Sequence, residues 1–410
     1  MTSTNSGPEN PVEKQYSEYS YPEPGDDIPA WLKSWSYGCY DPSGYEALHW
    51  PEGRPKQNLD VLVAGCGTMQ AAVLAFNNPD CTFTGIDFSQ TSIAHEERLR
   101  QRHNLTNLTL QKMDLRDAAK LGRSFDLIVS TGVLHHLPDP NEGLRALASV
   151  LEPLHGVMCL MVYGRMARVG VYALQDAFRR IGVPQTTDGI KFVRATIQRL
   201  PPRHPARWYF DTSPEMNSDA AIVDTFLHPQ DTAYSVQDVL DFVENNGLVF
   251  KGWLDSAPYN DESIGLGPDI ADRDRWSIAE NLSGRMGQHR FMASLPQRDP
   301  ANAVGFDGTQ WLKYYPRRNP GLRVSDADPN KCFREGHEFT MSPLEAMLLE
   351  LADGHKPIAQ ILKHKQFAQL APEQRTALVR DFYRKMWRQS HVFLSAVPIK
   401  PRAGSKQPGI

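Results

Sequence analysis

Apolar and polar positions divide the early part of the chain into blocks that have the lengths of strands and helices. Residues 60–64 form a short apolar run that ends at a turn with two glycines, which is typical of a buried strand. Residues 70–76 are predicted to form a helix, and residues 82–87 a second strand that ends on an acidic residue. This order predicts half of a nucleotide-binding α/β unit.

A second periodic stretch lies near the middle of the chain. Ser235 is placed to cap a helix there, and Gly247 is placed to end it in the left-handed conformation. The apolar positions between them recur at helical spacing: Val236, Val239, Leu240 and Val243. Residues 248–254 and 289–295 are predicted strands, and the polar residues 255–288 are predicted to form the long loop between them.

The C-terminal part is predicted to be a small α-rich domain over residues 303–398, reached through a linker and followed by a polar tail at 399–410. Its predicted elements are a helix at 342–354, helices at 358–363 and 372–390, and a strand at 392–395. Ser342 caps the first helix and Gly354 ends it. Three helices and a strand resemble a winged helix and, more loosely, the peptide-binding PqqD-type domains. Because no basic recognition helix stands out, DNA binding is not expected.

The glycine turn near the N-terminus carries the first sign of chemistry. Gly65 and Gly67 have no Cβ, so the backbone there can turn sharply and approach a ligand closely. Asp87, at the end of the next strand, is placed to accept hydrogen bonds from ribose hydroxyls. A dinucleotide fingerprint would have a third glycine at position 70, where this chain has Gln70. The turn therefore argues against a dinucleotide, and it fits either a nucleotide-type site or an ordinary buried strand followed by a turn.

Further segments, in order along the chain, extend this pattern to a known family. Residues 61–68, VLVAGCGT, resemble the first motif of class I S-adenosylmethionine-dependent methyltransferases. The other similar segments are GIDFS at 85–89, KMDL at 112–115, FDLIVSTGVLHHLPD at 125–139 and GVMCLMV at 156–162. The resemblance implies an α/β fold with a Rossmann-like seven-stranded sheet, and S-adenosyl-L-methionine as cofactor.

The resemblance also implies which residues contact that cofactor. Asp87 would bind the ribose, and Asp114 would lie near the adenine amino group. The full set of implied cofactor contacts is Gly65, Cys66, Gly67, Asp87, Phe88, Asp114, Leu115 and Thr131. Met69 departs from the family pattern, where many relatives have glycine, and suggests a tighter turn at the cofactor carboxylate.

Two adjacent histidines follow the predicted fourth strand, where the family carries out its chemistry. His135 and His136 are candidate general bases, since an imidazole can take a proton near neutral pH. The alternative is that the pair only shapes the loop and packs against the cofactor. His228 is a weaker candidate base.

Two segments outside the predicted sheet are candidates for covering the site. Residues 1–50 are predicted to be a tail and a cofactor lid, with Tyr16 and Tyr21 as contacts. Within the methyltransferase domain, predicted at 51–297, residues 164–232 form an insertion after the fifth strand. It is predicted to contain helices at 171–181 and 190–200 and a prolyl, aromatic segment at 201–210. It would cap the substrate, because ligands bind beyond the carboxyl ends of such strands. The alternative is a dimerisation arm, which would make the protein a homodimer.

Composition adds few constraints. The 410 residues carry a formal net charge of −4, which gives no overall attraction to nucleic acid or to an anionic membrane. No apolar run approaches the roughly 18 residues that span a bilayer. The five cysteines are scattered with no C-x-x-C pair, which predicts reduced thiols, a cytoplasmic protein and no metal site of zinc-finger spacing.

Two classes of function follow. The first is an active methyltransferase that modifies an O or N nucleophile of a small molecule or of a peptide or protein side chain. The second is a scaffold or regulatory subunit that binds the cofactor without turnover. The presence of Gly65, Gly67, Asp87 and Asp114 favours the enzyme. Fold alone does not choose the substrate.

Overall fold

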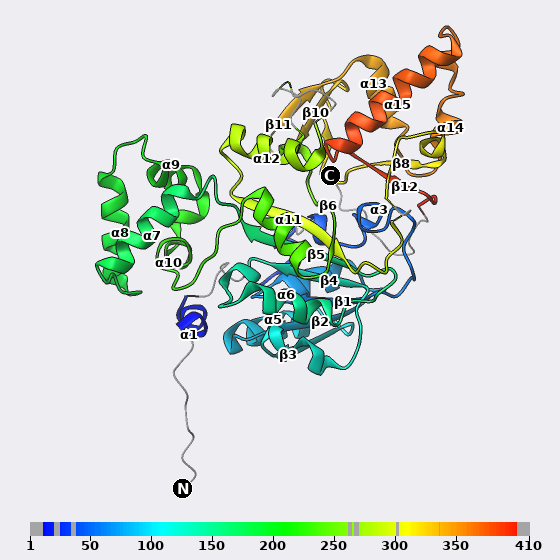
Figure 1. Cartoon of the computed structure of the whole chain (residues 1–410). Helices are drawn as coiled ribbons and strands as arrows, with labels where there is room; N and C mark the ends of the chain where they lie inside the picture. Colours follow the sequence, from blue (N-terminus) through cyan, green and yellow to red (C-terminus); the bar gives the residue numbers. More distant parts are fainter. Residues whose placement is uncertain are drawn as a thin grey trace.

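A seven-stranded sheet forms the centre of the protein, seen here in a computed structural model that describes residues 11–19, 25–33, 38–260, 265, 270–300, 303–335 and 337–399 (Figure 1). The strands are β1 Asp60–Ala64, β2 Thr82–Asp87, β3 Leu108–Lys112, β4 Leu127–Thr131, β5 Val157–Tyr163, β6 Val249–Trp253 and β7 Gln288–Ser294. Their order is β3-β2-β1-β4-β5-β7-β6, and only β7 runs antiparallel to its neighbours. The predicted fold class is therefore confirmed.

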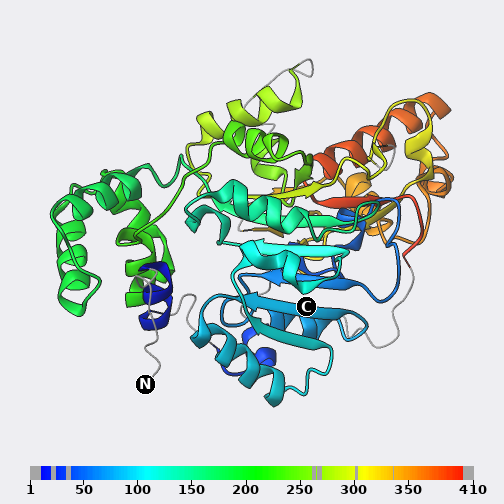
Figure 2. The ribbon, with the colours of Figure 1, turned by 60° about the horizontal axis from the view of Figure 1, so that its bottom comes forward.

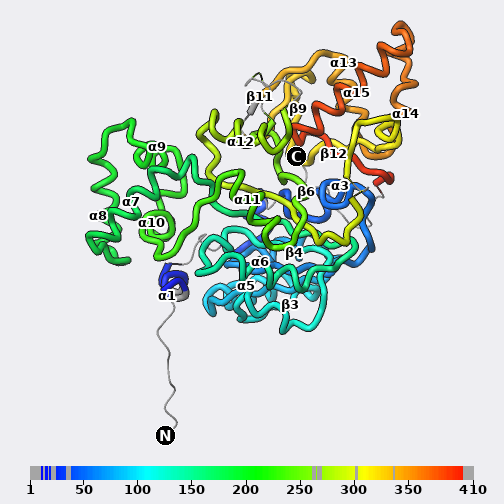
Figure 3. The backbone as a smooth tube through the Cα atoms, in the orientation of Figure 1, coloured from blue at the N-terminus to red at the C-terminus, as the bar shows by residue number. Residues whose placement is uncertain are grey.

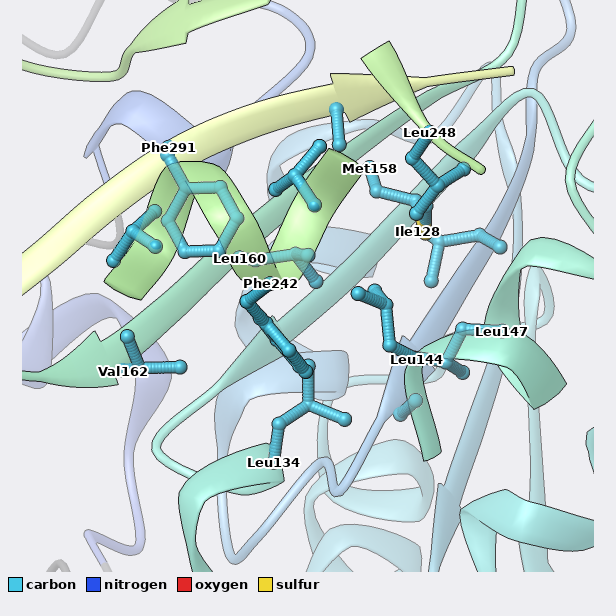
Figure 4. Packing of buried hydrophobic residues seen from close by; sticks show 14 of the residues in the cluster. Ile128, Leu134, Leu144, Leu147, Met158, Leu160, Val162, Phe242, Leu248 and Phe291 are labelled. Atoms are coloured by element: carbon cyan, nitrogen blue, oxygen red, sulfur yellow. The ribbon is translucent and has the colours of Figure 1, made fainter. Parts of the chain in front are cut away.

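Helices cover both faces of this sheet and bury two apolar clusters. One face packs against α6 Pro140–Ala148 and α11 Val236–Asn245, and the other against α4 Gln70–Asn77 and α5 Gln90–Arg102. Figure 4 shows the first cluster, where Leu144, Leu147 and Phe242 meet side chains of β4 and β5. Each fully buried side chain of this size stabilises the fold by about 1.5–3 kcal/mol.

Local sequence signals set the helix starts. Ser235 and Asp238 form the reciprocal capping box that begins α11, as the sequence predicts for Ser235. Asp139 caps α6, with Pro140 in its first turn. The prediction of a long loop at 255–288 is partly wrong, because this segment contains α12 Asp272–Ser283. That helix has few buried apolar positions, so its periodicity in the sequence is weak.

The insertion after β5 is a bundle of four α-helices. They are α7 Val169–Arg180, α8 Thr187–Arg199, α9 Pro205–Thr212 and α10 Asp219–Phe226. The bundle has its own apolar cluster and stands beside the sheet rather than on either face (Figure 2). The first two helices were predicted, whereas α9 replaces the predicted prolyl segment because Pro205 occupies its first turn, where proline is tolerated.

The N-terminal segment lies against both the insertion and the sheet domain. Helix α1 Pro11–Glu18 is next to the bundle in Figure 3, and it also contacts α5. The elements α2 Ile28–Trp31, η1 Gly38–Tyr40 and α3 Glu46–His49 follow, and Trp50 is buried against the core. Tyr21, a predicted lid contact, lies outside the described residues.

The C-terminal part has a separate apolar cluster. The elements of the C-terminal part are η8 Gln310–Lys313, β8 Tyr315–Arg318, β9 Arg323–Val324, β10 Lys331–Arg334, β11 His337–Thr340, α13 Pro343–Glu350, α14 Ile358–Ile361, η9 Lys365–Phe367, α15 Pro372–Arg388 and β12 Val392–Ser395. The predicted helices and terminal strand are present, while strands β8 to β11 were not predicted. Its likeness to a winged helix stays a prediction.

Polar contacts join this part to the sheet domain. Arg334 pairs with Asp255, and the Ser256 and Ser390 hydroxyls are 2.7 Å apart. The Tyr45 and Phe393 rings also pack together, with centroids 5.4 Å apart. In the described part of the chain, no helix is long and apolar enough to cross a membrane.

Candidate active site

The glycine turn and Asp87 form one hydrogen-bonded unit at the carboxyl ends of β1 and β2. The Asp87 carboxylate accepts from the Gly67 N–H at 2.9 Å and from the Ser89 N–H at 2.8 Å. Burial raises the pKa of Asp87, and these two N–H groups oppose that rise. The predicted ribose acid thus also holds the turn in place.

The two glycines of the turn serve different purposes. Both have left-handed φ, +71° at Gly65 and +59° at Gly67, which disfavours other residues. A Cβ on Gly65 would lie 2.4 Å from Val133 Cγ2, so this glycine is needed for packing. A Cβ on Gly67 would have no neighbour within 4 Å. Gly67 therefore borders open space, which suits the close approach of a cofactor.

The remaining residues of the turn are enclosed by protein. Burial raises the pKa of the Cys66 thiol well above its ordinary range, which fits a packing role and not a nucleophile. Met69 is also buried, and its sulfur accepts from the Gly25 N–H at 3.1 Å, so its side chain packs against the N-terminal segment. At the start of α4, the Ala71 and Ala72 N–H groups both donate to Glu96 at 2.9 Å.

The predicted adenine-side residues occupy the neighbouring loops. Asp114 caps η2 Leu115–Leu121 and forms a bidentate pair with Arg116, with a shortest distance of 2.7 Å. Burial alone would raise the pKa of Asp114, but the hydrogen bonds and the charge of Arg116 outweigh burial. The pKa is therefore lower than usual, and the carboxylate stays ionised. Leu115 is buried in the core and Phe88 is half-buried. Thr131, at the end of β4, donates to Gln70 at 2.9 Å.

The two predicted histidines lie in a buried polar cluster at the ends of β4 and β5. They belong to η3 Leu134–His136, and their rings are 4.1 Å apart. His136 Nδ1 is 2.9 Å from the Gln230 carbonyl, and the His136 ring stacks on His228 at 3.8 Å. Burial, with His136 and Arg168 nearby, holds the pKa of His135 well below its ordinary value.

Carboxylates and tyrosines from other segments complete this cluster, which we call the histidine cluster: His135, His136, His228, Asp224, Asp231, Arg168, Tyr16 and Tyr163. The Asp224 carboxylate accepts from the Tyr16 hydroxyl at 2.8 Å and from the Tyr163 hydroxyl at 3.3 Å. Arg168 lies 3.8 Å above the Tyr163 ring, and its guanidinium is 3.5 Å from Asp231.

The cluster is assembled from four separate parts of the chain: α1, η3, the end of β5 and the insertion. Tyr16 is the predicted lid residue that the structure places there, with its ring edge-on to Phe88 and His136. Asp224, Asp231 and Arg168 were not predicted, because residues so far from the histidines in sequence form no local motif. Trp208, in the predicted aromatic segment of the cap, is 45% exposed, whereas its neighbour Tyr209 accepts a hydrogen bond from Arg168 at 2.9 Å.

Comparisons with known proteins agree with this architecture. A family model described as a methyltransferase domain matches residues 62–158. The uncharacterized protein syc1184_c of Synechococcus sp. is 31% identical over 337 residues, which are 76% of this chain and 77% of that protein. Two structures of PKMT2 from Rickettsia typhi, one in complex with AdoHcy, have TM-scores of 0.62 and 0.61 at 14% and 16% identity. They cover 87% of this chain and 75% and 76% of those chains, and the likeness shows a shared fold.

Strand order, glycine turn and strand-end acid together define a class I S-adenosylmethionine-dependent methyltransferase. This chain belongs to that family. Its cofactor is S-adenosyl-L-methionine. The open space at Gly67 and the acid at Asp87 fit that molecule.

Proposed function

We propose that the protein transfers a methyl group to an O or N nucleophile that binds at the histidine cluster, under the insertion. The acceptor is a small molecule or a peptide or protein side chain. The observation that supports this most is the position of the cluster. It lies directly after β4 and β5, beyond the same edge of the sheet as the glycine turn and Asp87.

The insertion and α1 would exclude water from this site. The insertion leaves at Gly164 and returns at Tyr234, and these two residues pair as a bridge beside the end of β5. Gln185 of the insertion donates to Gln15 of α1 at 2.7 Å, which joins the two covers. A bound cofactor supplies a methyl on a sulfonium, already activated. The chain then has mainly to hold the acceptor in line, and such positioning lowers a barrier by about 7–11 kcal/mol at best.

Asp224 is the residue through which we would test the acceptor site. It is fully buried, it is held by two tyrosine hydroxyls, and it lies outside the turn that binds the cofactor. Asp224→Asn keeps the size of the side chain but removes its charge. Trp208→Ala is a matched control, because Trp208 belongs to the same insertion but is exposed.

The assay would follow a labelled methyl from S-adenosylmethionine into cell extract that is separated into small-molecule and protein fractions. We expect transfer by the wild type into one of these fractions, which identifies the acceptor class. Asp224→Asn should reduce transfer by about tenfold or more, the equivalent of 1.4 kcal/mol, while Trp208→Ala should not. S-adenosylhomocysteine affinity, measured by calorimetry, should be preserved in both variants. Undiminished transfer by Asp224→Asn would contradict the proposed acceptor site.

A further inference from the structure

Several polar atoms of the histidine cluster have no hydrogen-bond partner among the described residues, although they are buried. They are both ring nitrogens of His135 and Oδ1 of Asp231. The His135 side chain is fully buried, and the Asp231 side chain has no exposed surface. A buried polar group without a partner costs about 1–3 kcal/mol, so several together at one place indicate a missing ligand.

The charge of the cluster indicates that this ligand is a cation. Arg168 pairs with Asp231 and also acts at longer range on Asp224, whose carboxylate accepts from the neutral hydroxyls of Tyr16 and Tyr163. One guanidinium thus balances one of two buried carboxylates. An excess of buried negative charge is costly unless a cation neutralises it.

Two groups of three side chains in this cluster have the spacing of metal ligands. In each group, one donor atom per residue lies within 4.8 Å of the other two. The first group is His135, His136 and Asp231, and the second is His136, Asp224 and His228. Imidazole and carboxylate donors of this kind suit Zn²⁺, Co²⁺ and similar divalent ions.

Hydrogen bonding decides between the two groups. His228 Nδ1 accepts from the Gln230 N–H at 3.1 Å, so its other nitrogen carries the proton and has no lone pair for a metal. The Asp224 oxygens already accept from two tyrosines. In the first group, each residue has a nitrogen or oxygen atom with a lone pair that is available to a metal ion. Asp231 Oδ1 and the His135 nitrogens have no partner in the described part of the chain. His136 Nδ1 faces the Gln230 carbonyl, which leaves the Nε2 lone pair available.

We propose that His135, His136 and Asp231 bind one divalent transition-metal ion of the Zn²⁺ type. The His136 bond to the Gln230 carbonyl is the kind of support that orients a metal-bound imidazole. Three protein ligands leave a fourth position open, as in catalytic zinc sites. An oxygen or nitrogen of the acceptor would bind there and lose its proton more readily. His135 and His136 would then act on the acceptor through the ion.

The test uses the full-length, tag-free protein, freed of metal by a chelator and titrated with Co²⁺. We expect one equivalent to bind with a visible absorption band, and Zn²⁺ to displace it. Loss of a supporting residue alone weakens metal sites about 10–100-fold, so His136→Asn and Asp231→Asn should weaken binding by about 100-fold or more. His228→Asn is the comparison variant, because His228 belongs to the same cluster but not to the first group, and it should weaken binding by less than about tenfold, below the loss expected from substituting a ligand.

Calorimetry with S-adenosylhomocysteine would show that each variant is folded. Absence of saturable Co²⁺ binding by the wild type would overturn the proposal. Unchanged binding by folded Asp231→Asn would also overturn it, as would loss of binding in His228→Asn, which would select the other group. The metal proposal rests on its own observations. If the wild type binds no metal but Asp224→Asn still loses methyl transfer, only the metal proposal fails.

Discussion

Replacing Gly67 by alanine tests whether the open space beside the glycine turn is the cofactor site. Gly67 has a φ of +59°, and an added Cβ would meet no heavy atom within 4 Å. The substitution therefore causes no clash in the protein itself. Its cost to folding is the cost of a left-handed alanine, about 1–2 kcal/mol.

Cofactor binding should suffer an additional loss. A methyl group inserted into a closely packed contact costs about 1–3 kcal/mol, so Gly67→Ala should weaken binding of S-adenosylhomocysteine about 5- to 150-fold. Gly67→Val should abolish binding, because its side chain would fill more of the space.

A matched control separates the two effects. Gly247 has a φ of +72° and also has no atom within 4 Å of an added Cβ, but it lies in the turn between α11 and β6, at the opposite edge of the sheet. Gly247→Ala should reduce the free energy of unfolding by the same amount, about 1–2 kcal/mol, and leave cofactor affinity unchanged.

Urea unfolding would give the stability of both variants, and calorimetry with S-adenosylhomocysteine would give their affinities. If Gly67→Ala binds with the affinity of the wild type, the open space is not the cofactor site. Equal losses of affinity in both variants would mean that binding follows stability alone.

Three further predictions concern the acid, a buried carboxyl and the C-terminal part. Asp87→Ala should weaken S-adenosylhomocysteine binding by about 1–3 kcal/mol in calorimetry, and it should also lower the urea midpoint because the Gly67 and Ser89 N–H groups lose their acceptor. Unchanged affinity would refute its role as the ribose acid. Burial raises the pKa of Glu96 from 4.5 to about 8. Between these pH values the folded protein keeps a proton that the unfolded chain releases. The contribution of Glu96 to the free energy of unfolding therefore falls as pH rises from 4.5 to 8. Glu96→Gln cannot ionise and should lessen that fall in urea titrations between these pH values, whereas parallel curves for variant and wild type would contradict the shift. A chain that ends at residue 300 should still bind S-adenosylhomocysteine, because the sheet closes at β7, although its thermal midpoint should drop with the loss of the Arg334–Asp255 pair. Loss of cofactor binding by that folded fragment would argue against a separate C-terminal domain.

The sheet and the glycine turn could be predicted because their signals are local. Residues 60–64, the turn after them and Asp87 lie within a short stretch, and each has a backbone or polar role that few residues can fill. Helix α11 was equally predictable, since Ser235 and Asp238 form its capping box within the first turn.

The acceptor side of the site could not be predicted in the same way. His135 and His136 were found because the family motif includes them, but Asp224 and Asp231 have no sequence pattern of their own. They reach the histidines only because four helices of the insertion pack into a bundle and return the chain to Tyr234. The helix α9 was missed because a proline-rich sequence resembles a loop, although Pro205 stands where proline can start a helix.

The contact between Tyr16 and Asp224 constrains how this enzyme could be re-engineered or could diverge. The hydroxyl comes from the first described helix and the carboxylate from the insertion, 208 positions later. A chimera that takes the insertion from a relative would leave Tyr16 facing a foreign surface unless α1 were exchanged with it. The two segments therefore form one transferable module, and a change of acceptor by recombination would need breakpoints on both sides of the cofactor motifs.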